Sequence, residues 1–290
     1  MKLTKYLFLV LILIAFAVWT LAFTGVRDDK LHIIACDVGQ GDAILVIQEN
    51  YQLLIDGGPN DSVIACLDRY IPIDDSVLEA VVLTHPDKDH YGGLDSVLDH
   101  YKVETFIYSG LESSSDSYQV LKNALGGMVD SVMPVSSDQV LRLGLIYLDI
   151  YNPQRSNTED NMLGIQDKDA DKNEYSVVIN LRFGEFDALL TGDLSPDAGK
   201  KMVDNNNLPD VEYIKVSHHG SKNGLDEFLL SKVKPEIAVI SVGKNSYGHP
   251  HPEVLDLLSR YAIETLRTDI HGDIEVISDG NIWWVEGRKK

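Results

Sequence analysis

The chain has 290 residues, 44% of them hydrophobic and 24% charged, an ordinary composition for one large globular domain or two small ones. Its net charge of −20 excludes nucleic-acid binding through a broad basic face, although it leaves open the capture of phosphate at a bound metal ion. The two cysteines form no C-x-x-C pattern. Cys36 falls in an expected strand and Cys66 in an expected helix, and we predict two separate buried thiols, with a disulfide as the alternative.

The N-terminal segment differs in composition from the rest of the chain. Lys2 and Lys5 precede the span Tyr6–Phe23, which contains no charged residue. This length is at the low end for a membrane-spanning helix and long for a signal-peptide core. Because the lysines precede the span and Asp28 and Asp29 follow it, we expect a cytoplasmic N-terminus and an exported remainder. An uncleaved membrane anchor is favoured, with cleavage and secretion as the alternative.

Beyond an anchor segment at residues 1–30, turn residues divide residues 31–290 into alternating strands and helices without a repeat or a linker. We expect strands at Leu31–Cys36, Ala43–Gln48, Tyr51–Ile55, Ala80–Leu83, Thr105–Tyr108, Leu145–Tyr151, Ser176–Phe183, Phe186–Leu190, Val211–Val216, Ile237–Ser241, Ile274–Ile277 and Ile282–Val285. We expect helices at Ser62–Tyr70, Gly93–Tyr101, Ser117–Leu125, Pro196–Val203, Asp226–Ser231 and Pro252–Tyr261. Strand clusters interleaved with helices predict an α/β fold with layers of sheet covered by helices.

A polar segment, Asn152–Tyr175, interrupts this rhythm. Its alternating carboxylates are similar to those of a calcium loop, but Lys172 stands where such a loop needs glycine and Val178 where it needs glutamate. We therefore expect an acidic loop near the mouth of a functional site.

The segment Thr84–His90 carries the clearest chemical signal. It holds two histidines and two aspartates directly after the apolar run Ala80–Leu83, and Tyr91–Gly93 then breaks the chain. These side chains would spread from the carboxyl end of a strand, where α/β folds build their sites. Neutral imidazole and ionised carboxylate are the usual ligands of a hydrolytic divalent metal. The alternative, a solvated acidic turn, does not account for a histidine at each end.

Three further segments could converge on the first. Two are strands that end in a carboxylate and in paired imidazoles, and the third is a loop with two more histidines: Ala188–Asp193, Ile214–Ser221 and Asn245–Pro252. Six of the nine histidines lie in Thr84–His90 and the last two of these segments. Convergence of these strand ends predicts a metal centre.

Six motifs occur in the order Asp37-Val38-Gly39-Gln40-Gly41-Asp42, Leu54-Ile55-Asp56-Gly57-Gly58, His85-x-Asp87-x-Asp89-His90-x-Gly92-Gly93, Leu190-Thr191-Gly192-Asp193, His218-His219-Gly220-Ser221 and Tyr247-Gly248-His249-Pro250-His251-Pro252. On these motifs the chain resembles a metallo-β-lactamase-fold hydrolase, specifically the hydrolase domain of the ComEC competence channel family. The resemblance covers about Leu31 to Val285. Because only one anchor and no multi-helix channel accompanies the motifs, we expect a free-standing relative, to which a role in DNA uptake does not transfer.

The resemblance implies a four-layer αββα sandwich with a metal pair at one edge. It implies that His85 and Asp87 hold one ion, that Asp89 and His90 hold the other, and that Asp193 bridges them. One of His218 and His219 would complete the second position, and the residues leave open which one.

The chain also departs from the broad superfamily. Asp87 stands where histidine is usual, and no histidine lies between His100 and Asp193, where another ligand of the first ion is commonly found. We expect His100 on a helix surface. More oxygen ligands favour a harder ion, so Mn²⁺ competes with Zn²⁺, and we expect one or two ions with the first position the weaker.

Further residues are expected to act around the metal. Asp56 and Asp37 are expected to orient ligands, and Asp89 to serve catalysis as well as metal binding. A phosphate oxygen or the leaving group is expected to be met by His249, Asn245 or Ser221. His251 is expected to be structural. Lys215 and Lys222 either add local positive charge or are solvated.

The resemblance therefore implies a metal-dependent hydrolase acting outside the cytoplasm, most directly a phosphodiesterase or nuclease with DNA as the first candidate substrate and no dinucleotide cofactor. One alternative is an envelope phosphodiesterase for small or cell-wall esters, such as choline-phosphate esters. Another is a non-catalytic subunit in DNA handling. Hydrolysis of β-lactams is disfavoured because the metal motif resembles the competence-type branch.

Overall fold

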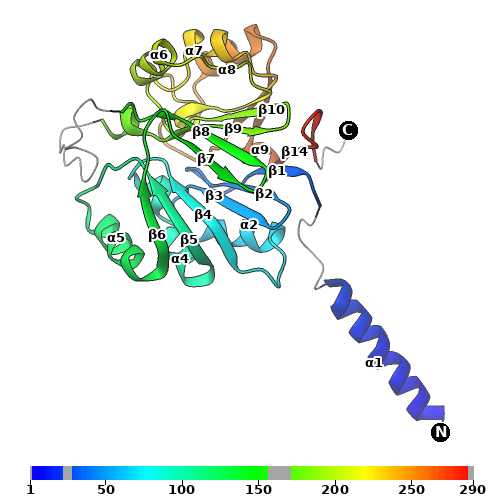
Figure 1. Ribbon diagram of the computed structural model, residues 1–290. Helices are drawn as coiled ribbons and strands as arrows, with labels where there is room; N and C mark the ends of the chain where they lie inside the picture. The colour runs from blue at the N-terminus through cyan, green and yellow to red at the C-terminus, as the bar shows by residue number, and fades with distance from the viewer. Residues whose placement is uncertain (1, 22–27, 156–170, 287–290) are drawn as a thin grey trace.

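The computed structural model describes residues 2–21, 28–155 and 171–286, which form two facing sheets with helices outside them (Figure 1). The first sheet contains β1 (Leu31–Ala35), β2 (Ile44–Gln48), β3 (Tyr51–Ile55), β4 (Val77–Leu83), β5 (Lys102–Tyr108), β6 (Val129–Pro134), β14 (Ile274–Ser278) and β15 (Trp283–Val285). Its strand order is β15-β14-β1-β2-β3-β4-β5-β6. The second contains β7 (Val140–Leu143), β8 (Ile146–Asn152), β9 (Val178–Phe183), β10 (Phe186–Leu190), β11 (Tyr213–Lys215), β12 (Ile237–Ile240) and β13 (Glu264–Arg267), in the order β13-β12-β11-β10-β9-β8-β7.

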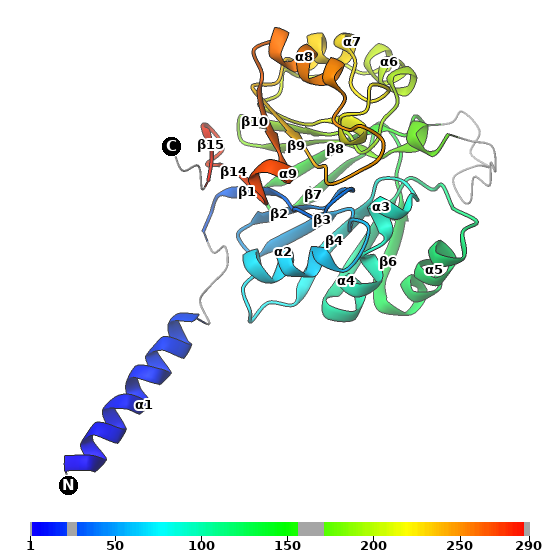
Figure 2. The same cartoon turned by 180° about the vertical axis from the view of Figure 1, so that it is seen from behind.

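Helices cover the outer face of each sheet (Figure 2). On the first sheet lie α2 (Ser62–Tyr70), α4 (Leu94–His100) and α5 (Asp116–Met128), and on the second lie α6 (Pro196–Asn205), α7 (Glu227–Val233) and α8 (Pro252–Arg260). The short helices α3 (Lys88–Tyr91) and α9 (Thr268–His271) follow strand ends. The expected four-layer αββα sandwich is therefore confirmed.

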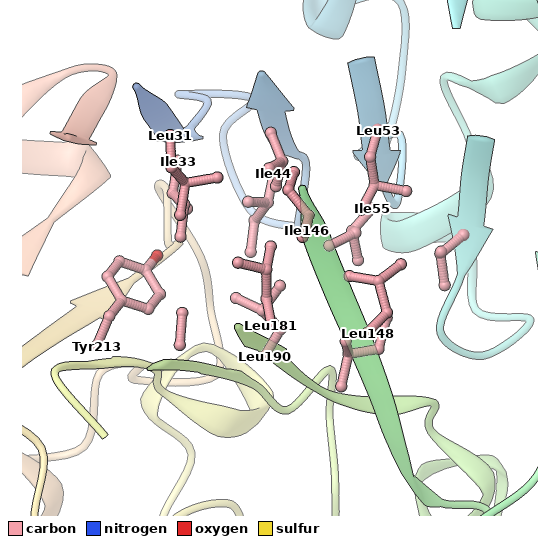
Figure 3. Packing of buried hydrophobic residues seen from close by; sticks show 14 of the residues in the cluster. Leu31, Ile33, Ile44, Leu53, Ile55, Ile146, Leu148, Leu181, Leu190 and Tyr213 are labelled. Atoms are coloured by element: carbon pink, nitrogen blue, oxygen red, sulfur yellow. The ribbon is translucent and has the colours of Figure 1, made fainter. Parts of the chain in front are cut away.

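The main hydrophobic core lies between the sheets (Figure 3). Side chains of β1, β2 and β3 face those of β8, β9 and β10, and Tyr213 of β11 closes one side. Two smaller cores fill the spaces between each sheet and its helices. In β1, Leu31 and Ile33 enter the central core while Ile34 enters an outer one, which explains why this strand is apolar throughout.

The sequence pattern misses the more polar strands. β6, β7 and β13 were not expected, because their exposed and half-buried residues lack a continuous apolar run. By contrast, β3, β10 and α2 have the predicted bounds.

The expectation of two separate thiols is wrong, because Cys36 and Cys66 form a disulfide. Cys36 directly follows β1 and Cys66 lies on α2, which packs over that strand end with a Cα–Cα distance of 5.9 Å. Thirty residues separate the two cysteines in sequence, so their proximity depends on the fold.

Helix α1 (Lys2–Leu21) lies apart from the sandwich, and the apolar side chains of Tyr6 to Ile14 are exposed (Figure 1). Within the described ranges, we find no helix whose length and hydropathy suffice to cross a membrane. The expected boundary at residue 30, between an anchor segment and the hydrolase domain, stays a prediction. The expected acidic loop falls mainly on residues 156–170, outside the described residues, and so do the first four positions of its calcium alternative, residues 167–170.

Candidate metal centre

Loops that follow the carboxyl ends of strands meet at one edge of the sandwich. β3 runs parallel to β4, and β10, β11 and β12 run parallel to one another, so their carboxyl ends point to the same edge in each sheet. Beyond these ends lie the chemically active segments: Asp56, Thr84–His90, Thr191–Asp193, Ser217–Gly220 and Ser241–Gly243.

His90 and Asp193 lie at the centre of the site and are both buried. His90 Nε2 is 3.4 Å from Asp193 Oδ1, while His219 Nε2 is 3.6 Å from Asp193 Oδ2 and 3.4 Å from Asp89 Oδ2. The ring of His85 lies beside that of His90, with centroids 4.1 Å apart. Ligand atoms within 4.8 Å of one another form four overlapping groups in the described residues. Two are His85-His90-Asp193 and Asp89-His90-His219, and the other two, Asp42-Asp193-His219 and Asp42-Asp56-His90, include Asp42.

Four buried atoms at this centre have no hydrogen-bond partner in the described part of the chain: Nε2 of His85, His90 and His219, and Oδ1 of Asp193. Each unpaired buried polar atom costs about 1–3 kcal/mol, and folded proteins leave few of them. A divalent cation would satisfy such atoms together, because neutral imidazole and carboxylate are its ordinary ligands. The residues therefore fit a divalent metal ion.

Hydrogen bonds behind the imidazoles orient them. His90 Nδ1 is 2.7 Å from Asp56 Oδ2, and Asp56 itself accepts from the backbone N–H and the hydroxyl of Thr84. His219 Nδ1 is 2.9 Å from the carbonyl oxygen of Ser241. Since a carboxylate and a carbonyl only accept, both rings donate from Nδ1 and keep the Nε2 lone pair free for a metal.

A buried ion pair, Asp42–Lys215, lies beside the centre. Lys215 Nζ also donates to the carbonyl of Gly192 at 3.0 Å and is 3.7 Å from Asp193 Oδ1. Burial lowers the pKa of Lys215, but Asp42 and Asp193 raise it by more, so the ammonium stays charged. Although burial opposes it, His219 and His90, whose own pKa values are raised so that they are protonated without a metal, act together with Lys215 to hold the pKa of Asp193 well below its usual range. Asp193 is therefore a carboxylate at every ordinary pH.

The backbone separates the paired histidines. His218 and His219 have φ values of 52° and 53°, in the left-handed region that is costly for residues other than glycine. Their rings diverge at 77°, and the structure directs His219 toward Asp89 and His90. The His218 side chain is 29% exposed, with Nε2 3.7 Å from Asp193 Oδ2, and belongs to none of the four groups found in the described residues.

His249 lies on the open side of the centre. Its ring centroid is 5.6 Å from that of His218, and its Nδ1 atom has no hydrogen-bond partner among the described residues. Burial lowers the pKa of His249, and the neighbouring His218 lowers it further, so the ring is neutral near pH 7. Tyr247 stacks against His249 and is 74% exposed.

A model of the metallo-β-lactamase superfamily matches residues 36–244. The chain belongs to this superfamily. It is therefore a superfamily hydrolase by family and fold, and the expected resemblance is confirmed.

Two bacterial relatives of this chain are ComE operon protein 3 and Recombination protein 2. The chain is 33% identical over 202 residues to ComE operon protein 3 of Bacillus subtilis. This match covers 68% of this chain and 24% of that protein. The chain is 28% identical over 271 residues to Recombination protein 2 of Haemophilus influenzae. This match covers 92% of this chain and 31% of that protein. The chain thus matches a third or less of the length of these relatives.

The fold also matches a solved structure. YhfI, a metallo-β-lactamase-fold protein from Bacillus subtilis, aligns with a TM-score of 0.54 over 86% of this chain and 100% of that chain. The identity is 14%, so the similarity shows the fold alone.

Asp87 was predicted to be a metal ligand, but its carboxylate lies outside the clusters of ligand atoms described above. It is 38% exposed in its side chain, and Oδ2 is 3.5 Å from His85 Nε2. Its other oxygen, Oδ1, accepts a hydrogen bond from the ammonium of Lys172. Among the described residues, Asp87 belongs to none of the groups of three or more close ligand atoms.

Asn245 was expected to contact substrate, but its amide is used within its own loop. Nδ2 donates to the carbonyls of Gly243 and His249, while Oδ1 accepts from the backbone N–H groups of Tyr247 and His249. The amide shapes the loop that carries His249 and has little capacity left for a phosphate. Ser221 is buried, and its hydroxyl oxygen accepts from the backbone N–H of Asn223.

Asp37 was expected to orient a ligand, and the structure corrects this. Asp37 is exposed, its backbone N–H donates to Asp273, and its Oδ1 accepts from Gly39. The aspartate of this turn that reaches the centre is Asp42, which pairs with Lys215. The one sequence signal for this pair was a lysine at the end of β11, between the buried Ile214 and Val216.

The remaining predictions concern residues around the centre. Lys215 is buried, which excludes the solvated alternative, whereas Lys222 is exposed. His251 caps α8 by accepting from the backbone N–H of Glu253, in keeping with a structural role. His100 lies on the helix surface as expected.

Proposed function

We propose that this chain is a metal-dependent phosphodiesterase, with single-stranded DNA as the first candidate substrate. The observation that carries the proposal is the convergence of unpartnered buried ligand atoms around Asp193, whose two oxygens face different imidazoles. Asp89, His90, Asp193 and His219 would hold one ion. We call this the inner position. His85 and Asp87, whose Nε2 and Oδ2 atoms lie 3.5 Å apart, would form the outer position of the pair.

Held by Asp89, His90, Asp193 and His219, a divalent ion would supply Lewis acidity, which would activate water and stabilise charge on a phosphodiester. The protein's part is to hold the ligands in one geometry. Asp56 orients His90, the carbonyl of Ser241 orients His219, and Lys215 places a positive charge 3.7 Å from Asp193 Oδ1. Because carboxylates contribute much of the ligand set, Mn²⁺ competes with Zn²⁺.

His249 is the proposed contact for the substrate. Its ring is neutral, because its pKa is lowered by burial and by His218, so it is suited to donate a hydrogen bond to a phosphoryl oxygen. Its Nδ1 atom is free of partners in the described structure, and the Asn245 amide fixes the loop on both sides of it. Such a donor acts on the transition state without binding the metal.

Nucleic acid is favoured as substrate by the names of the relatives, ComE operon protein 3 and Recombination protein 2. The chain's net charge of −20 provides a specific argument for the alternative, a small or zwitterionic phosphoester such as a choline-phosphate ester, because an acidic surface repels a long polyanion. The two readings share one metal chemistry and differ in what the surrounding surface accepts.

We also propose that the catalytic part lies outside the cytoplasm, either anchored or released after cleavage. The Cys36–Cys66 disulfide supports this, because structural disulfides persist mainly in oxidising compartments. The lysines before an uncharged N-terminal span agree with it. A reporter fused after Lys290 should be active only when the reporter requires export, and activity of a cytoplasmic reporter would contradict the proposal.

The activity is tested with the purified full-length chain, loaded with Mn²⁺ or Zn²⁺. The substrates are single-stranded DNA, bis-p-nitrophenyl phosphate, p-nitrophenyl phosphocholine and nitrocefin. We expect both DNA and bis-p-nitrophenyl phosphate to be hydrolysed and nitrocefin to remain intact. Hydrolysis of the phosphocholine ester without DNA cleavage would favour the alternative, and inertness toward every phosphodiester with both metals would refute the phosphodiesterase.

A further inference from the structure

A lysine ammonium from a distant segment lies beside Asp87, in the outer position of the proposed metal pair. Lys172 Nζ donates to Asp87 Oδ1 and lies 3.3 Å from the carbonyl oxygen of Pro86. Lys172 is separated in sequence from Asp87 by 85 positions and from Pro86 by 86 positions, so both contacts depend on the tertiary fold. Asp87, the carboxylate that replaces the usual histidine, is therefore engaged on the side away from His85.

The segment that carries Lys172 is fixed next to the centre. It forms a short 3-10 helix, Lys172–Tyr175, whose first turn is capped by Asp171 accepting from the backbone N–H of Asn173. Asn173 Nδ2 lies 3.4 Å from His218 Nδ1, and Asn152 donates to the carbonyl of Glu174. Contacts on both sides thus hold the lysine over the outer position.

Charge balance distinguishes this position from the inner one. The Asp87 carboxylate lies between two groups of the protein: Oδ1 accepts a hydrogen bond from Lys172 Nζ, and Oδ2 is 3.5 Å from His85 Nε2. The carboxylate of Asp89, two residues along, contacts no lysine in the described structure and faces the unpartnered Nε2 of His219. A metal ion bound by Asp87 would have to displace the Lys172 ammonium from Oδ1, whereas one bound by Asp89 would displace no lysine, and the nearest ammonium there is that of Lys215, 3.7 Å from Asp193 Oδ1.

We propose that the ammonium of Lys172 takes the place of the outer metal ion, so that this chain holds a single divalent ion at Asp89, His90, Asp193 and His219. The proposal rests on the proposed metal centre and specifies its composition. Lys172 then supplies a fixed positive charge on the His85 side. An ammonium has three N–H donors, of which two are used by Asp87 and Pro86, so one remains for a phosphate oxygen.

The test is a count of ions. The full-length chain is depleted of metal, titrated with Mn²⁺ alone, and examined by native mass spectrometry, with elemental analysis after gel filtration. The same measurement is made on Lys172→Ala, Lys172→Arg and the control Lys88→Ala, which removes an equal charge from an exposed side chain beside Asp87. Circular dichroism checks each fold, and Lys172→Gln replaces the alanine variant if that one unfolds.

We expect one ion per chain in the wild type, in Lys172→Arg and in Lys88→Ala, and two ions in Lys172→Ala, because His85, Asp87 and Asp193 are then free to bind the second. Two ions in the wild type would overturn the proposal, and so would one ion in a folded Lys172→Ala protein. A wild-type chain that binds no ion would instead refute the metal centre itself, so the two failures are distinguishable.

Discussion

Asp87 is the N-cap residue of α3 and Asp89 lies in its first turn, and their side chains are almost equally exposed, at 38% and 37%. Their contacts nevertheless differ. Asp89 faces the buried imidazole of His219, whereas Asp87 is paired with Lys172. The residue types in the motif therefore do not determine how many ions a centre holds. A single cation from a distant segment can convert a ligand position into an ion pair.

The largest expected effect separates these two aspartates. Asp89→Ala should lose its metal and its hydrolytic activity while keeping its fold, because Asp89 belongs to the inner group and the core lies in strands remote from it. Asp87→Ala should keep one ion and lose less than about tenfold in rate, since it leaves the inner ligands in place. Elemental analysis and hydrolysis of bis-p-nitrophenyl phosphate measure both. Equal loss of metal in the two variants would remove the distinction.

The next effect concerns the charge beside the inner position. Lys215→Met should lower the free energy of unfolding by about 3–5 kcal/mol, because it leaves the Asp42 carboxylate buried without its partner. Chemical denaturation measures the loss. The matched control, Lys222→Met, removes a lysine from an exposed position near the same histidines and should change stability by less than about 0.5 kcal/mol. Similar values for both variants would show that the buried pair has no special weight.

On the open side, His249→Ala should retain its metal and lose about 10²-fold in turnover, the scale of a lost transition-state hydrogen bond. The expectation follows from the position of His249 beside His218 and outside the ligand groups. Metal content and turnover are measured on the same preparation. Stoichiometric loss of metal would instead identify His249 as a ligand.

Only part of this site could be predicted from the amino-acid sequence. The strand-end motifs identified the residues of the inner group, because strands β4, β10 and β11 are apolar runs that end where the ligands begin. Sequence could not reveal the Asp42–Lys215 pair or the Asp87–Lys172 pair, since each joins segments brought together only by the fold. The assignment of Asn245 failed for a local reason, because its amide bonds to its own loop.

The fold itself follows the same division. Strands buried on both faces were predicted closely, whereas β6 and β7 were missed because solvent covers part of them and their sequences are mixed. The disulfide was predicted wrongly, since spacing along the chain does not report the distance between Cα atoms. What the sequence pattern records is burial and strand ends, and what it omits is pairing between distant segments.

The smallest expected effect lies outside the centre and concerns how the stability of the fold depends on pH. His32 is buried on β1, and although burial lowers its pKa, Glu275 and Asp28 raise it above the ordinary value of 6.5. A raised folded-state pKa contributes stability that is fully present below about pH 6.5 and is lost as the pH rises through the folded value. From pH 6 to pH 9, the wild type should therefore lose stability relative to His32→Gln. Denaturant unfolding at both pH values measures this, and a gain relative to the variant would reverse the sign.

The metal centre is tested most directly by Asp193→Ala, because Asp193 contacts both His90 and His219. The wild-type and variant chains are stripped with a chelator, reloaded with Mn²⁺ or Zn²⁺, and assayed for bound metal and for hydrolysis of bis-p-nitrophenyl phosphate. We predict that the wild type regains metal and activity, and that the variant regains neither while its circular dichroism spectrum is unchanged. Full hydrolysis by a metal-depleted Asp193→Ala protein would contradict the assignment of a metal-dependent hydrolase centred on this residue.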